Sequence, residues 1–123
     1  MSLVSKILIA DDDNEMRESL ASLLAHAGYK VIEAADGQEA VEMAAKDLPS
    51  LIMLDIHMPK MDGLTACKVI KSNQLTRHIP VVMLTVEGNI AEIQQSIGYG
   101  ASTYITKPSS KDEILKVVKS ILY

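Results

Sequence analysis

Residues 51–55 read Leu-Ile-Met-Leu-Asp, four apolar residues followed directly by an aspartate. The apolar residues do not alternate with polar ones, which is typical of a central strand that is covered on both faces of a parallel sheet. Three further strand-like runs, residues 6–10, 81–84 and 103–106, are also followed by polar residues. Because the carboxyl ends of parallel strands lie along one edge of a sheet, we expect these polar residues to converge there.

Segments with helical periodicity separate the strand-like runs, which include a short run at residues 31–34. Apolar residues recur at helical spacing between Met16 and Ala27, and again in segments around residues 40–44, 64–70, 89–97 and 110–122. This alternation predicts an α/β fold, a three-layer, doubly wound sheet of five parallel strands. Periodicity does not determine the strand order. A flavodoxin-like order 2-1-3-4-5 would bring Asp11 and Asp12 beside Asp55.

Composition limits the possible classes of protein. A chain of 123 residues fits one domain, 1–123, of which residues 1–3 could be a cloning remnant. The net charge of -4 argues against direct binding of nucleic acid by this domain, and no apolar stretch is long enough to span a membrane. The single cysteine, Cys67, excludes an intrachain disulfide and is expected to be a buried helix residue. We therefore expect a cytoplasmic protein.

Three carboxylates, those of Asp11, Asp12 and Asp55, are expected at this edge of the sheet. Carboxylates so close together repel one another unless a positive charge compensates them. Mg2+ prefers octahedral oxygen ligands, commonly one or two carboxylates with waters and a phosphate. We expect Asp12 and Asp55 to bind Mg2+ directly and Asp11 to act through a water. The backbone carbonyl of His57 could add a further oxygen.

Asp55 is also placed to act as a nucleophile, because carboxylates form acyl-phosphate intermediates in phosphoryl transfer. The ammonium group of Lys107 could contact one phosphoryl oxygen, and the hydroxyl of Thr85 could donate a hydrogen bond to another. These residues predict a site for phosphoryl transfer that works by positioning and electrostatics.

The motifs at the strand ends resemble those of the receiver domain of two-component response regulators, including chemotaxis regulators, over nearly the whole chain. Residues 6–17 (Lys-Ile-Leu-Ile-Ala-Asp-Asp-Asp-Asn-Glu-Met-Arg) are similar to the family's opening strand, acidic pair and first helix. Residues 54–59 (Leu-Asp-Ile-His-Met-Pro) and 61–63 (Met-Asp-Gly) are similar to its phosphoacceptor segment. Residues 82–85 (Val-Met-Leu-Thr) and 104–108 (Tyr-Ile-Thr-Lys-Pro) complete the set.

The resemblance implies a phosphoprotein of a phosphorelay, with the strand order 2-1-3-4-5. The roles that it implies are phosphorylation of Asp55, binding of Mg2+ by Asp11 and Asp12, switching by Thr85 and Tyr104, and phosphate contact by Lys107. The donor would be a phosphohistidine on a sensor histidine kinase or on a histidine phosphotransfer protein. The domain would phosphorylate and dephosphorylate itself without turning over an external substrate, and so would not be an enzyme in the usual sense.

The resemblance also implies a switch. A phosphoryl group on Asp55 would draw the Thr85 hydroxyl toward it, and the ring of Tyr104 would fill the vacated space. This change would reshape the face formed by the fourth helix, the fifth strand and the fifth helix, and so control an output domain or partner. The identity of that output is not written in the sequence. The fourth helix lacks the charge pattern of a dimer face, so dimerisation is left open.

The chain departs from the family pattern at a few positions around the site. Val86 stands where a small residue is usual, and its branched side chain could narrow access to the phosphoryl site. His57 and Glu87 could modulate phosphoryl transfer or hydrolysis. Ser109 replaces a frequent phenylalanine.

Two other functions stay open at this point. A Mg2+-dependent phosphohydrolase of the haloacid-dehalogenase type also uses a nucleophilic aspartate, but that class expects a second aspartate where this chain has His57. A pseudo-receiver that binds partners without being phosphorylated is the other alternative. The presence of Asp11, Asp12, Asp55, Thr85 and Lys107 argues against it.

Overall fold

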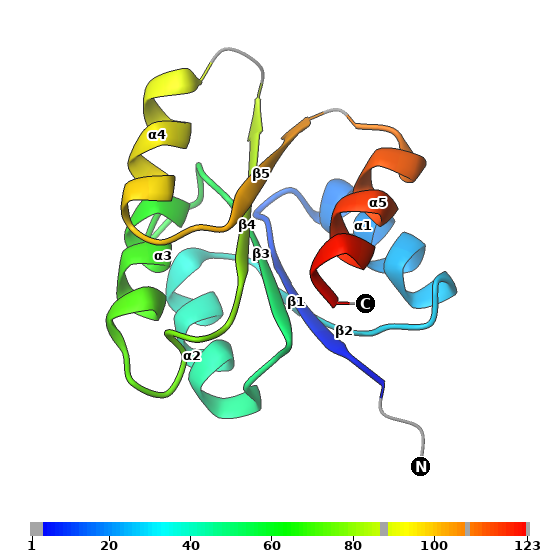
Figure 1. Cartoon of the computed structure of the whole chain (residues 1–123), viewed down its shortest axis with the longest axis horizontal. Helices are drawn as coiled ribbons and strands as arrows, with labels where there is room; N and C mark the ends of the chain where they lie inside the picture. The colour runs from blue at the N-terminus through cyan, green and yellow to red at the C-terminus, as the bar shows by residue number, and fades with distance from the viewer. Residues whose placement is uncertain (1–3, 87–88, 108, 123) are drawn as a thin grey trace.

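The computed structural model describes residues 4–86, 89–107 and 109–122. Its five strands form one parallel sheet in the order β2-β1-β3-β4-β5. The strands are β1 (Lys6–Ala10), β2 (Lys30–Ala34), β3 (Leu51–Asp55), β4 (Val81–Val86) and β5 (Thr103–Lys107). The expected flavodoxin-like order is confirmed, and β4 and β5 run side by side with their carboxyl ends pointing the same way (Figure 1).

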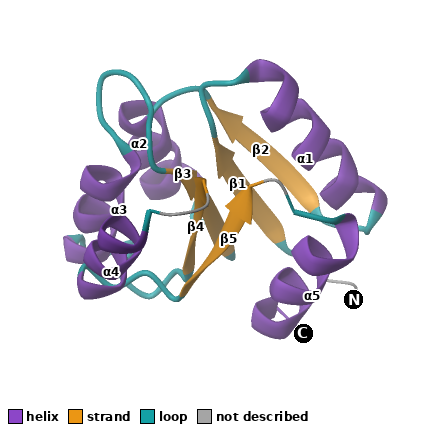
Figure 2. Cartoon of the chain, turned by 90° about the horizontal axis from the view of Figure 1, so that it is seen from above, coloured by secondary structure: helices purple, strands orange, loops and turns teal. Residues whose placement is uncertain are grey.

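Five helices cover the sheet in two outer layers. They are α1 (Asn14–His26), α2 (Gly37–Asp47), α3 (Gly63–Ser72), α4 (Ile90–Gly98) and α5 (Lys111–Leu122). Figure 2 shows α1 and α5 on one face of the sheet and α2, α3 and α4 on the other. The predicted three-layer, doubly wound architecture is confirmed. No helix in the described part of the chain has both the length and the apolar character needed to cross a bilayer.

Two apolar cores, one on each face, hold the layers together. In β1 and β3, Leu8 and Ile52 pack into the core under α2 and α3, whereas their neighbours Ile7 and Leu51 pack into the core under α1 and α5. Because side chains alternate between the faces of a strand, a strand that contributes to both cores must be apolar throughout. This explains the unbroken apolar run at residues 51–54.

Aspartate side chains cap the N-termini of three helices. The side chains of Asp13, Asp36 and Asp62 each accept a hydrogen bond from the backbone N–H three residues later, at the start of α1, α2 and α3. Such caps satisfy N–H groups that have no partner within the helix. Gly28 follows the capping residue of α1 with φ +101°, a left-handed conformation that glycine adopts without Cβ strain.

The last three strands extend further than the sequence predicts. Asp55 and Lys107 are the final residues of β3 and β5, and Thr85 lies inside β4, rather than following these strands. The sheet register pairs Asp55 with Leu84 and Thr85 with Thr106. The sequence pattern predicts that these polar residues follow the apolar strands, but backbone pairing continues through them. Their backbones are therefore held by the sheet.

Candidate functional site

The acidic residues of the first and third strand–helix junctions meet at the carboxyl edge of the sheet. Asp11 follows β1 directly, Asp12 comes next, and Asp55 ends the neighbouring strand β3. One carboxylate oxygen from each of the three lies within 4.8 Å of the others. The expected convergence of these residues is thus present, and it follows from the pairing of β1 with β3.

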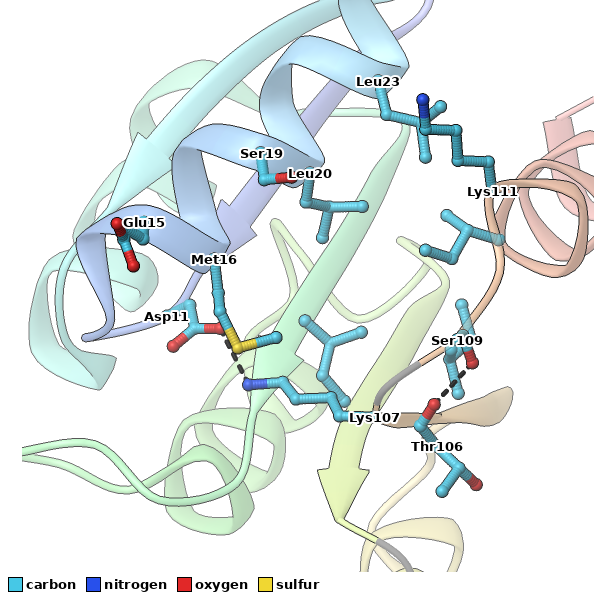
Figure 3. Close-up of a pocket in the computed structure, with 13 residues that line it drawn as sticks. Asp11, Glu15, Met16, Ser19, Leu20, Leu23, Thr106, Lys107, Ser109 and Lys111 are labelled. Atoms are coloured by element: carbon cyan, nitrogen blue, oxygen red, sulfur yellow. Dashed lines mark hydrogen bonds and ion pairs between the residues drawn. The ribbon is translucent and has the colours of Figure 1, made fainter.

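Lys107 lies between two of these carboxylates. Its Nζ donates a hydrogen bond to Asp11 Oδ2 at 2.8 Å and lies 3.3 Å from Asp55 Oδ1. Figure 3 shows the first of these contacts. The side chains of Lys107 and Asp55 are only 16% and 15% exposed, so the ion pairs are poorly screened by solvent. One ammonium thus bridges two carboxylates, one that directly follows β1 and one at the end of β3.

The titration of Asp55 reflects this crowding. Burial raises the pKa of Asp55 from 3.8 to about 6, the charge of Lys107 opposes the rise, and the charge of Asp11 adds to it. Burial alone would lower the pKa of Lys107, but its hydrogen bond to Asp11 and the charge of Asp55 outweigh burial, and the pKa is raised. Lys107 therefore stays protonated but does not fully compensate the acidic residues.

The three carboxylates fit a hard divalent cation. Ligand oxygens of an octahedral Mg2+ lie about 2.1 Å from the ion, hence no more than about 4.2 Å apart. The three oxygens all lie within 4.8 Å of one another, which is close to this limit, and Asp12 is exposed. The raised pKa of Asp55 is a second indication, because a cation would stabilise its charged form.

The raised pKa of Asp55 predicts a dependence of stability on pH. Because the native-state pKa lies above the unfolded value, the native state binds more protons between pH 4 and 6, and stability falls as pH rises through this range. Without divalent cations, Asp55→Asn should unfold at the same denaturant concentration as wild type near pH 3, below the unfolded pKa of Asp55. At pH 7 it should be more stable by about 2 kcal/mol, and the rise in pKa sets an upper limit of about 3 kcal/mol.

Urea unfolding at a series of pH values measures this difference. Asp112→Asn removes an exposed carboxylate from the first turn of α5 and serves as the control for net charge. A stability difference between Asp55→Asn and wild type that does not vary with pH would contradict the predicted titration of Asp55.

Arg17 is a site residue that the sequence did not reveal. Its Nη1 donates to the backbone carbonyl of Asp11 at 2.7 Å, and its Nε pairs with Glu33 of β2 at 3.1 Å. The N–H of Asp13 donates to Asp11 Oδ1 at 3.0 Å. The junction between β1 and α1 is therefore held from both sides. Only the tertiary fold brings Glu33 to Arg17, so no local pattern could have indicated the contact.

Gly63 positions the segment that follows Asp55. A Cβ atom at Gly63 would lie 2.0 Å from the carbonyl oxygen of Asp55, so only glycine permits this approach. The N–H of Gly63 donates to the carbonyl of Ile56 at 2.6 Å, and Asp62 caps the helix that begins there. The loop after β3 thus closes onto its own start. The Met-Asp-Gly motif is visible in the sequence, whereas this contact depends on the fold of the loop.

The predicted switch residues lie on β4 and β5. The hydroxyl of Thr85 is buried and donates to the carbonyl of Val86 at 3.2 Å, while the ring of Tyr104 is exposed. The side chain of Val86 is exposed at the end of β4. Glu87 lies outside the described residues.

His57, in the loop between β3 and α3, contacts the first turn of α4. Its Nε2 lies 3.3 Å from Glu92 Oε1. The roles predicted for Thr85, Tyr104, Val86, Glu87 and the carbonyl of His57 stay predictions.

The fold and the site together define a class: doubly wound parallel α/β domains with an aspartate, two acidic neighbours and a lysine at the carboxyl edge of the sheet. Residues 7–119 match the model of the response regulator receiver domain, and the chain belongs to this family. It is 40% identical over 117 residues to the DNA-binding dual master transcriptional regulator RpaA of Synechocystis sp., covering 95% of this chain and 48% of RpaA. It is 38% identical to the response regulator MprA of Mycobacterium leprae, covering 95% of this chain and 50% of MprA.

Solved structures agree with this assignment. The chemotaxis protein CheY4 of Vibrio cholerae superimposes with a TM-score of 0.91 at 31% identity, covering 97% of this chain and 99% of that one. The receiver domain of a signal transduction histidine kinase from Syntrophus aciditrophicus gives 0.89 at 34% identity, covering 97% and 90%. The chain spans about half the length of the curated relatives it matches. The family consists of signalling proteins rather than metabolic enzymes.

Proposed function

We propose that this domain accepts a phosphoryl group on Asp55 and uses it to control an output. The observation that supports this most strongly is the meeting of Asp11, Asp12 and Asp55 at one edge of the sheet, with Lys107 in contact with two of them. A single reactive carboxylate, a cation site and a fixed ammonium are the groups that phosphoryl transfer to an aspartate needs.

In the proposed reaction, an Oδ atom of Asp55 attacks phosphorus. A bond forms between this oxygen and phosphorus, and the bond between phosphorus and the donor atom breaks, with the electron pair leaving on the donor. Lys107 already lies 3.3 Å from Asp55 Oδ1, so it is close enough to contact a phosphoryl oxygen there. The reactive form of Asp55 is the carboxylate, which a pKa near 6 keeps predominant at neutral pH.

Asp11, Asp12 and Asp55 would hold the Mg2+ ion, with the carbonyl of His57 as a further predicted ligand. When bound, Mg2+ neutralises charge on the phosphoryl oxygens and on the carboxylates. Asp11 is held in place by Lys107, Asp13 and Arg17, whereas Asp12 is exposed. We therefore expect Asp12 to adjust its position on binding more than Asp11 does.

The output face would be the surface formed by α4, β5 and α5. In the structure, the Thr85 hydroxyl is bonded to the carbonyl of Val86 and the ring of Tyr104 is exposed. These positions of Thr85 and Tyr104 are the ones expected of the domain before phosphorylation. Phosphorylation would turn Thr85 toward Asp55 and allow the ring of Tyr104 to move inward, which changes the surface that a partner contacts.

The proposed donor is a phosphohistidine on a sensor histidine kinase or on a histidine phosphotransfer protein. The family relatives include a DNA-binding regulator, so an output domain that binds DNA is one possible target. We propose that this domain itself does not bind nucleic acid, since its net charge is -4, and that it acts in the cytoplasm.

Incubation with Mg2+ and a small phosphodonor tests the proposal. The expected product is a Mg2+-dependent adduct on Asp55 that is stable in acid and labile in base, measured by intact-protein and peptide mass spectrometry. Steady turnover of a generic phosphate ester would favour a phosphohydrolase of the haloacid-dehalogenase type. Absence of both the adduct and Mg2+ binding would favour a pseudo-receiver.

Lys107→Ala separates binding of the cation from the switch. We expect Mg2+ affinity to stay within about threefold of wild type, because the three carboxylates are intact and only a competing cation is lost. Beryllofluoride should then fail to change the NMR shifts of α4 and β5, because the contact between the phosphoryl mimic and β5 is missing. Lys119→Ala, on the exposed side of α5, is the control. Wild-type shift changes in Lys107→Ala would refute this role.

A further inference from the structure

Asp12 is the least constrained of the three acidic residues that meet at the edge of the sheet. The carboxylate of Asp11 is buried and accepts hydrogen bonds from Lys107 and from the N–H of Asp13. Asp55 is the last residue of β3, where backbone pairing holds it. Asp12 is exposed, so the position of its carboxylate depends chiefly on the backbone that carries it.

The backbone that leads into Asp12 is fixed from β2 by two routes. The N–H of Asp11 donates to the carbonyl of Ala34, the last residue of β2, at 3.1 Å. The carbonyl of Asp11 belongs to the peptide group shared with Asp12, and it accepts from Arg17 Nη1 at 2.7 Å. Arg17 is in turn paired through Nε with Glu33 of β2 at 3.1 Å. Arg17 therefore connects β2 to the peptide group that carries Asp12.

The guanidinium of Arg17 joins three parts of the fold. In addition to the contacts with Asp11 and Glu33, its Nη2 donates to Asn14 Oδ1 at 2.8 Å, at the start of α1. The helix lies beside β2 (Figure 2). The side chain of Arg17 is only 13% exposed, so these hydrogen bonds are partly shielded from water. The rigid, planar fork of an arginine can serve several acceptors at once, whereas the ammonium of a lysine acts as a point charge.

The charge of Arg17 and its hydrogen bonds have opposite effects on a bound cation. A guanidinium close to the site repels Mg2+, so removal of the charge alone would strengthen Mg2+ binding. Release of the Asp11 carbonyl would weaken Mg2+ binding, because the carboxylate of Asp12 would no longer be held near the other two. The sign of the change in affinity therefore distinguishes the two contributions.

We propose that Arg17, held by Glu33, is a positioning residue of the Mg2+ site and sets its affinity by fixing the peptide group between Asp11 and Asp12. The inference rests on the proposed function, in which these carboxylates hold Mg2+. Groups that orient metal ligands typically contribute tenfold or more to metal affinity. Arg17→Ala should therefore raise the dissociation constant for Mg2+ about tenfold.

Titration of the protein with Mg2+, followed by the amide NMR shifts of residues 11–13, measures this affinity. Arg17→Lys keeps the positive charge but loses the fork, and should bind Mg2+ almost as weakly as Arg17→Ala. Glu33→Ala frees the guanidinium from β2 without touching the acidic residues, and should also weaken binding. Arg77→Ala, which removes an exposed arginine between α3 and β4, is the matched control and should keep the wild-type affinity.

The Mg2+ dependence of phosphorylation separates positioning from chemistry. With acetyl phosphate as donor, the Mg2+ concentration that gives half of the maximal rate should rise in Arg17→Ala by the same factor as the dissociation constant. The rate at saturating Mg2+ should return to the wild-type value, because Asp55 and Lys107 are intact. Urea unfolding without Mg2+ checks that each variant is folded under the titration conditions. If Arg17→Ala does not fold, Arg17→Lys and Glu33→Ala carry the test.

The possible failures of the inference and of the proposed function can be told apart. Unchanged or tighter Mg2+ binding in a folded Arg17→Ala or Glu33→Ala variant would overturn the inference and leave the proposed function intact. Wild-type affinity in Arg17→Lys would also overturn it, because charge rather than the fork would then be sufficient. Absence of Mg2+ binding in the wild-type protein would refute the proposed function as well.

Discussion

Replacing Asp55 with alanine is expected to abolish phosphorylation by small donors and by phosphohistidine, with a rate at least about a thousandfold below wild type. Neither of the two neighbouring carboxylates is expected to substitute for it. Asp11 is held by Lys107 and by the N–H of Asp13, and Asp12 is exposed at the rim. The covalent bond would have to form on the residue at the end of β3. Mass spectrometry of the intact protein after incubation with Mg2+ and acetyl phosphate measures the loss.

Asp112→Asn, which removes an exposed carboxylate of α5 that is not part of the acidic cluster, should keep the wild-type rate. Loss of the adduct in an Asp55→Ala variant that still unfolds cooperatively would separate chemistry from folding. An adduct of wild-type yield in Asp55→Ala would mean that another residue is the acceptor. The central assignment of the site would then be wrong.

Gly63→Ala is expected to destabilise the domain by about 3 kcal/mol or more, since overpacking alone costs 1–3 kcal/mol and here the contact is with rigid backbone. The new Cβ would lie 2.0 Å from the carbonyl oxygen and 2.8 Å from the carbonyl carbon of Asp55. Neither atom can move without displacing Asp55 or breaking the pairing of β3. The midpoint of urea unfolding should fall, and the yield of phosphorylated protein should fall with it.

Gly98→Ala is the matched control, because a Cβ at Gly98 meets nothing within 4 Å. Gly98 is the last residue of α4, where alanine favours the helix by up to about 1 kcal/mol over glycine. We expect a neutral or slightly positive change in stability. If Gly63→Ala and Gly98→Ala changed the unfolding midpoint equally, the close approach of Gly63 to Asp55 would have no energetic consequence.

The sequence predicted the repeating pattern of strands and helices because each element is long enough to show its own period. Residues 51–54 are apolar throughout, since both faces of β3 are covered, and this was readable without coordinates. The exact ends of β3, β4 and β5 were not. Asp55, Thr85 and Lys107 are polar, yet pairing with neighbouring strands extends the sheet through them. Polarity marks solvent access at a strand end, not the end of backbone pairing.

The amino-acid sequence by itself determined the class of fold and which carboxylates, hydroxyl and ammonium stand at strand ends, because these are properties of short segments. Tertiary structure alone decided that Lys107 contacts Asp11 and Asp55, that Arg17 holds the carbonyl of Asp11, and that a cavity opens beside them. The contact between Asp11 and Lys107 joins residues separated by 96 positions. Such contacts depend on the order in which strands lie side by side. The hydrophobic periodicity of a single segment does not determine that order.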